Sequence, residues 1–253
     1  TEARLWTDGR YFIQAAAQLK GTTVELMKMG EPGVPEMNAY IEEVLKEGET
    51  LGFDGRVVSV GEGEGYAAIA GKKNAKVNYQ VDLIDEIWED RPVLSEEPAF
   101  NLDVKYAGET VASKLARIRE EMKEAGTNVH VVSTIDDICW TLNIRGNDID
   151  FFPLVLSYGI ITMYSFELYI DEKKLDDKLK AKLEKDGVNL HPYNDIYEDV
   201  KKFGSDVVAM IDPGKLNYAL FNNIPENVKT VEKRNPAILM KAIKNPVEIE
   251  NIR

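Results

Sequence analysis

An arginine at the junction of a predicted strand and a predicted helix is the first residue whose type and place could do chemistry. Arg10 follows Asp8 and Gly9, a turn signal, because glycine accepts positive φ and aspartate bonds the backbone locally. Crevices at such junctions bind ligands in open α/β sheets. A guanidinium offers a carbonyl or a carboxylate a rigid fork of donors. A surface arginine paired with Asp8 or a glutamate fits the same pattern, so both roles stay open.

Arg145 is a second candidate. It follows an apolar segment with a helical pattern and precedes Gly146. This places its positive charge at a helix C-terminus, where the charge interacts favourably with the helix dipole. A purely structural role therefore competes with a binding role at this position.

The other residue types that could catalyse or bind metal have ordinary structural explanations. His130 and His191 are far apart and belong to no helical metal-binding pair. Asp136 and Asp137 follow Thr134 in a pattern that resembles a capping box, so helix capping explains them better than a metal pair. We assign no catalytic and no metal-binding residue.

The glycine-rich stretch 61–65 lies near a predicted helix start, where phosphate loops also occur. It lacks the dinucleotide-binding spacing and the P-loop lysine, and its two glutamates would repel a phosphate. The stretch is better explained as the flexible start of a helix.

The elements that must position these residues alternate between strand and helix, which is typical of an α/β protein. In the first part we expect strands over 3–7, 22–29, 50–54 and 76–81, and helices over 10–19, 34–45 and 62–72. In the second part we expect strands over 129–133, 151–157, 160–170, 189–192, 207–211 and 230–232, and helices from 111, 135, 173, 193, 217, 236 and 247. The unit 6–29 and the unit 166–191 share a strand–turn–helix–strand order, which suggests a duplicated fold.

A proline- and glutamate-rich stretch without periodicity, 90–98, marks the clearest break in the chain. We therefore predict a domain boundary within 90–101. A chain of 253 residues has room for about two domains.

Composition narrows the function class. The net charge of −13 argues against nucleic acid and against an anionic membrane surface as partners. No apolar run reaches the ~20 residues of a membrane span. The single cysteine, Cys139, excludes an intrachain disulfide framework and fits a reducing compartment.

Several long motifs in order resemble the N-terminal region of the three-domain Xaa-Pro aminopeptidases (aminopeptidase P), metallopeptidases with a creatinase-type catalytic domain. The motifs are Trp6-Thr7-Asp8-Gly9-Arg10, Leu26-Met27-Lys28-Met29-Gly30, the run 81–92, the run 136–146, and His191-Pro192-Tyr193. The resemblance implies an α/β fold of two ribonuclease-H-like creatinase N-terminal domains, with mixed sheets flanked by helices. It implies a first domain over 1–95 that is incomplete at its start, a second over 96–240, and the beginning of a connection to a catalytic domain over 241–253.

The resemblance also implies a function. The parent enzyme would be cytoplasmic and would remove the N-terminal residue from peptides with proline second, using two divalent metal ions, usually manganese. Those metals would lie in a catalytic domain outside this sequence, so the chain itself would carry no cofactor and no activity. The family assigns the arginine matching Arg10 to substrate binding, and Arg145 would help to shape the mouth of the active site. The resemblance is compatible with a homodimer. The alternative function is a free-standing creatinase-N-like binding module without activity; a nuclease inferred from fold alone is disfavoured by the acidic charge.

Overall fold

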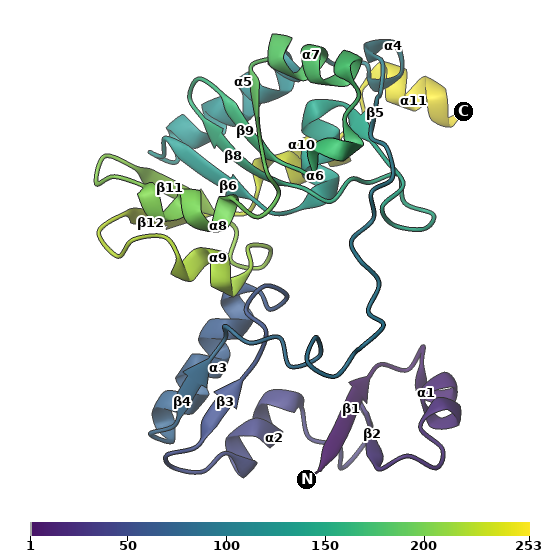
Figure 1. Ribbon diagram of the computed structural model, residues 1–253, viewed down its shortest axis with the longest axis vertical. Helices are drawn as coiled ribbons and strands as arrows, with labels where there is room; N and C mark the ends of the chain where they lie inside the picture. Colours follow the sequence, from purple (N-terminus) through teal and green to yellow (C-terminus); the bar gives the residue numbers. More distant parts are fainter. Residues whose placement is uncertain (1) are drawn as a thin grey trace. The chain divides into compact units, whose positions relative to one another are not determined.

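The computed structural model describes residues 2–253, and the chain divides into two compact units (Figure 1). The first unit contains the residues up to Gly52 together with Gly63–Asn78. The second unit contains Phe53–Glu62 and Tyr79–Arg253. The short segment 53–62 therefore leaves the first part of the chain and packs within the second unit.

The first unit is built from parallel strand pairs and helices. Its elements are β1 (Ala3–Thr7), α1 (Phe12–Gln18), β2 (Val24–Lys28), α2 (Met37–Val44), β3 (Thr50–Gly52), α3 (Val60–Lys72, which begins in the second unit) and β4 (Lys76–Asn78). β1 pairs with β2, and β3 pairs with β4, both in parallel. A small core forms where Leu45, Ile69 and Ala70 pack together. The indole N–H of Trp6 donates to the carbonyl of Pro35 at 2.9 Å, which fixes β1 against the loop before α2.

The second unit is organised around a six-stranded sheet of order β10-β9-β8-β6-β11-β12. Its main elements are β5 (Phe100–Asn101), α4 (Val104–Ala107), α5 (Val111–Glu124), β6 (Val129–Val132), α6 (Ile135–Leu142), β7 (Ile144–Arg145), β8 (Tyr158–Thr162), β9 (Phe166–Tyr169), α7 (Asp177–Lys185), β10 (Val188–His191), α8 (Ile196–Asp199), β11 (Val208–Ile211), α9 (Tyr218–Asn222), β12 (Lys229–Glu232), α10 (Pro236–Ala242) and α11 (Pro246–Ile252). β8 runs antiparallel to β6 and β9, and the other neighbours are parallel. The predicted α/β class with a mixed sheet is confirmed.

Side chains of the central strands alternate between two cores, one on each face of the sheet. On β11, Met210 packs with the helices α5, α6 and α7, whereas Ala209 and Ile211 pack with α8 and α9. Helices thus cover both faces, as Figure 1 shows. The α5 stripe that the sequence predicts, from Val111 to Met122, is fully buried in the first of these cores.

Two predicted strands are wrong. Residues 151–157 form an irregular loop, in which Phe151 has a φ of 67° and a fully exposed ring. The predicted strand 160–170 is a hairpin of β8 and β9, and the turn lies at 163–165 instead of at Tyr158-Gly159. Gly159 lies inside β8 because the Phe166 ring packs over it; a Cβ there would come within 2.5 Å of the ring.

The domain boundary within 90–101 stays a prediction. Most side chains from 82 to 98 are exposed, and this stretch has turns and irregular backbone. Its contacts are mostly surface ion pairs, in which Arg91 binds Asp82 at 2.5 Å and Glu96 binds Lys173 at 2.5 Å. We expect limited proteolysis to cut first within 90–101, because exposed irregular backbone is cleaved most readily. A first cut inside 151–170 would contradict this assignment.

Candidate functional site

Arg10 lies in the first unit, in the turn between β1 and α1. Its guanidinium forms a two-pronged ion pair with Asp8, with Nε–Oδ1 at 2.9 Å and Nη2–Oδ2 at 2.7 Å. The Arg10 hydrogen bonds lower the pKa of Asp8 to about 2. The Arg10 side chain is 79% exposed, so solvent and ligands can reach it. The structure thus holds the Asp8 pair that the sequence suggests, and the substrate-binding role stays a prediction.

Arg145 lies in the second unit, on β7, just after α6. Its Nη1 donates to the carbonyls of Cys139 at 2.9 Å and of Ile144 at 2.8 Å. Cys139 belongs to the last turn of α6, and its carbonyl also accepts the backbone N–H of the C-cap residue Asn143, so the guanidinium adds a second, charged donor at this helix end. Burial lowers the pKa of Arg145. The expected position at a helix C-terminus is confirmed, and a role in substrate binding stays a prediction.

A cleft that the sequence does not predict opens at the carboxyl ends of β6, β11 and β12. It has a volume of about 590 Å³ and is lined by Thr134, Asp136, Asp137, Asp212, Pro213, Lys215, Glu232, Lys233, Arg234, Ile238 and Lys241. Crevices of this kind bind ligands in α/β sheets. The sequence feature that could have predicted this cleft is the set of polar residues that directly follow three predicted strands.

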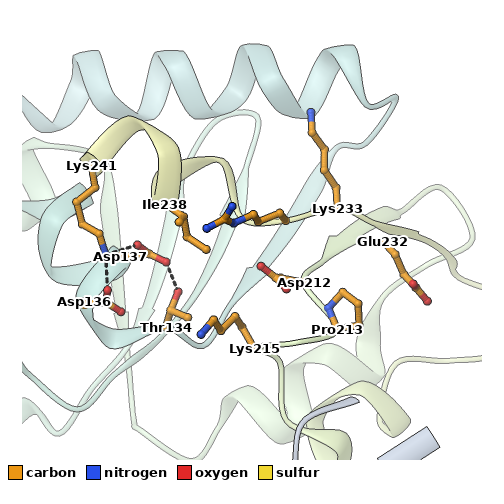
Figure 2. Close-up of a pocket in the computed structure, with 11 residues that line it drawn as sticks. Thr134, Asp136, Asp137, Asp212, Pro213, Lys215, Glu232, Lys233, Ile238 and Lys241 are labelled. Atoms are coloured by element: carbon orange, nitrogen blue, oxygen red, sulfur yellow. Dashed lines mark hydrogen bonds and ion pairs between the residues drawn. The ribbon is translucent and has the colours of Figure 1, made fainter. Parts of the chain in front are cut away.

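A buried polar network forms the floor of this cleft (Figure 2). The Asp137 carboxylate accepts hydrogen bonds from Thr134 Oγ1 at 2.6 Å and from Lys241 Nζ at 2.7 Å, both marked in Figure 2. It also accepts one from Asn235 Nδ2 at 2.9 Å. The predicted capping box is wrong, because Thr134 Oγ1 caps no backbone N–H and donates to the Asp137 side chain instead. Asp137 thereby connects α6 to α10.

Both histidines take part in internal contacts. The His130 ring is buried between the carbonyl of Met210 and the side-chain oxygen of Asn235, at 3.1 and 3.2 Å. Burial lowers the pKa of His130. His191 binds Glu167 at 2.7 Å and stacks on the ring of Tyr169. These contacts explain both residues without a metal.

The glycine-rich stretch lies in the first turns of α3, as the sequence predicts. Ser59 and Glu62 cap this helix start, since Ser59 Oγ donates to Glu62 Oε2 at 2.8 Å and accepts from the Glu62 backbone at 3.3 Å.

Residues 2–253 contain no group of three or more His, Cys, Asp or Glu side chains that could hold a metal ion. In the same range, no helix is long and apolar enough to cross a membrane.

Two family models cover most of the chain. Both describe a creatinase/prolidase N-terminal domain, one matching residues 1–87 and the other residues 90–248. The chain belongs to the creatinase/prolidase N-terminal domain family. Arg10 thus lies in the first matched domain, and Arg145 and the cleft lie in the second.

Named relatives of this creatinase/prolidase N-terminal chain are aminopeptidases. Aminopeptidase P2 of Arabidopsis thaliana is 39% identical over 77% of the chain and 28% of its own length. Xaa-Pro aminopeptidase app-1 of Caenorhabditis elegans is 37% identical over 77% of the chain and 32% of its own length. The chain therefore spans about a third of the length of these curated relatives.

A solved structure matches almost all of the chain. The crystal structure of X-prolyl aminopeptidase from Caenorhabditis elegans, described as a cytosolic enzyme with a di-nuclear active site, has a TM-score of 0.93 and 32% identity. The match covers 99% of the creatinase/prolidase N-terminal chain and 42% of that structure's chain.

Proposed function

We propose that this chain is the non-catalytic N-terminal part of a longer Xaa-Pro aminopeptidase, to which it contributes substrate binding and access control. The observation that carries the proposal is the match of both halves to creatinase/prolidase N-terminal domains, in a chain that spans about a third of its aminopeptidase relatives. The described residues also offer no metal-ligand group for the chemistry.

The longer protein would release the N-terminal residue of peptides with proline in second position. Two divalent metal ions, which we propose to be manganese, would activate a water molecule there. The described residues offer no ligand group that fits such a centre, and we propose that its ligands would lie in a part of the longer protein outside residues 2–253. The di-nuclear, cytosolic relative supports this proposal and a cytoplasmic location. We also propose that the longer protein is a homodimer, which a measurement of its molar mass in solution would test.

Within this function we propose Arg10 and Arg145 as substrate contacts. Arg10 is the better placed, because its exposed guanidinium is already aligned on a carboxylate and can exchange Asp8 for a substrate group. Arg145 holds two backbone carbonyls with Nη1, which leaves Nε and Nη2 for a ligand.

Kinetics of Arg10→Ala in the longer enzyme test the proposal. We expect kcat/KM on an Xaa-Pro-Xaa tripeptide to fall about 10- to 150-fold, the range for a lost hydrogen bond to a charged group. Arg10→Lys should recover little, since lysine lacks the fork. The melting temperature should barely move, because exposed ion pairs contribute little to stability.

Arg117→Ala is the matched control, since Arg117 is also an exposed arginine in an ion pair with a carboxylate, Glu109. It should leave kcat/KM unchanged. An unchanged kcat/KM in Arg10→Ala, or a loss matched by a large fall in melting temperature, would show that Arg10 is structural.

A further inference from the structure

Two cations that lack a carboxylate partner and are at least half-buried, Lys114 and Arg145, line one small cavity of the second unit, together with the exposed Lys244, whose Nζ donates to the carbonyl of Lys241. Lys114, on α5, is 1% exposed, and its Nζ donates to the Trp140 carbonyl and to Asn143 Oδ1, both at 2.7 Å. Arg145, on β7, binds only backbone carbonyls. Among residues 2–253 neither cation forms an ion pair. Buried charges are normally paired, so this arrangement requires an explanation.

The cavity that both cations line has a volume of about 210 Å³ and lies where α4, α5, α6 and α11 meet. Trp140 also lines it. The indole Nε1–H of Trp140 is buried and has no hydrogen-bond partner within the described part of the chain. Lys114 Nζ lies 4.3 Å from the centre of the Trp140 ring, so the ammonium group and the indole belong to one cluster.

The carboxylates nearest to this cluster are engaged elsewhere. Glu109 binds Arg117 at 2.9 Å and Ser113 Oγ at 2.7 Å. Glu248, which lines the cavity, accepts from the backbone N–H of Asn245 at 3.0 Å in a capping box. The Glu248 carboxylate keeps its negative charge in this hydrogen bond, so the cavity lining holds one carboxylate against three cations, Lys114, Arg145 and Lys244, and keeps an excess of positive charge. Burial lowers the pKa of Lys114 to about 8, because the charged ammonium group has lost water and forms no ion pair with a carboxylate.

We propose that this cavity binds a small carboxylate, held by Arg145, Lys114 and the indole N–H of Trp140. The Nε and Nη2 atoms of Arg145 have no partner among the described residues, and this edge of a guanidinium matches the two oxygens of a carboxylate. Lys114 has a third proton to donate, because its two acceptors use only two. The volume limits the ligand to a molecule such as acetate or to the carboxylate end of a longer one. The inference does not rest on the proposed aminopeptidase function, since it concerns binding to this chain alone.

The test follows the indole N–H resonance of Trp140 by NMR in the 253-residue chain, during titration with acetate at constant ionic strength. The chain has three tryptophans, so loss of one signal in Trp140→Phe assigns the resonance. We expect a saturable shift of the Trp140 signal with acetate and none with an equal concentration of chloride. Arg145→Gln should weaken acetate binding about 10-fold or more, as expected for a lost bond to a charged group.

Arg56→Gln is the control and should bind acetate normally, because Arg56 is an exposed arginine that donates to Asn194 Oδ1 and does not line the cavity. Gly-Gly-Gly and its C-terminal amide separate the two sources of a carboxylate. A response to the free peptide but not to the amide identifies a peptide C-terminus, whereas a response to acetate alone identifies a free small acid. An unmoved Trp140 signal, an equal response to chloride, or unchanged affinity in a folded Arg145→Gln would overturn the proposal.

Discussion

Replacing Lys174 with methionine is expected to lower the free energy of unfolding by about 3–5 kcal/mol, the usual loss when one partner of a buried ion pair is removed. Lys174 Nζ binds Asp148 Oδ2 at 2.5 Å, and the two side chains are 2% and 1% exposed. Asp148 Oδ1 has no partner among residues 2–253. Without the lysine, the buried carboxylate would keep only the backbone N–H of Leu156, at 2.6 Å. Urea unfolding of the variant and of the unchanged chain measures the loss.

Lys173 provides the matched control, because it is the neighbouring lysine and binds Glu96 on the surface. Lys173→Met should change the unfolding midpoint little. The double variant Lys174→Met/Asp148→Asn should recover about 1–2 kcal/mol, since it removes the uncompensated charge and keeps an acceptor for Leu156. Equal effects of Lys173→Met and Lys174→Met would contradict the buried pair.

The elements that the sequence predicts well are those whose structure depends on local interactions. The helix α5 begins at Val111 after the N-cap Thr110 and carries its buried stripe at helical spacing. The two strand–helix–strand units that share one order in the sequence, β1-α1-β2 and β9-α7-β10, both form parallel strand pairs. In these places propensity, capping and periodicity all favour one structure.

The segment around Phe151 was mispredicted because an apolar run does not show by itself whether it is buried. Phe151 and Phe152 are exposed, although their sequence resembles a central strand. Gly159 falls in the gap between the predicted strands 151–157 and 160–170, but it lies inside β8. It is needed inside a strand for close packing against Phe166, and only the tertiary structure shows this.

Among the candidate site residues, too, contacts between sequence neighbours could be predicted and contacts between distant residues could not. The Arg10–Asp8 pair spans two positions and could be suggested from the sequence. The Asp137–Lys241 pair spans 104 positions and could not. Lys114 gave a signal that we missed: it lies three residues after Val111 and four before Ile118, both buried, so it belongs to the apolar stripe of α5. A lysine within such a stripe is a candidate for a buried functional group.

Removal of Asp137 is expected to have the second largest effect. We expect Asp137→Ala to lower the free energy of unfolding by about 2–4 kcal/mol, equivalent to one or two charge-assisted hydrogen bonds. The carboxylate is 2% exposed and joins Thr134, Asn235 and Lys241. Without it, the buried amide of Asn235 loses an acceptor, and α10 loses its main polar link to α6. Denaturant unfolding measures the change.

The neighbouring Asp136 offers a strict comparison, because it binds the same Lys241 but is 52% exposed. Asp136→Ala should change stability little, since water replaces its partner. The loss in free energy of unfolding for Asp137→Asn should lie between those of the two alanine variants. Asparagine keeps the side-chain volume and one acceptor oxygen. It lacks the charge that Lys241 binds, and its amide N–H group would face a neighbour that is itself a donor. If Asp136→Ala and Asp137→Ala cost the same, the ion pair on the surface holds α10. If only Asp137→Ala is costly, the buried network on the floor of the cleft is what fixes α10 against α6.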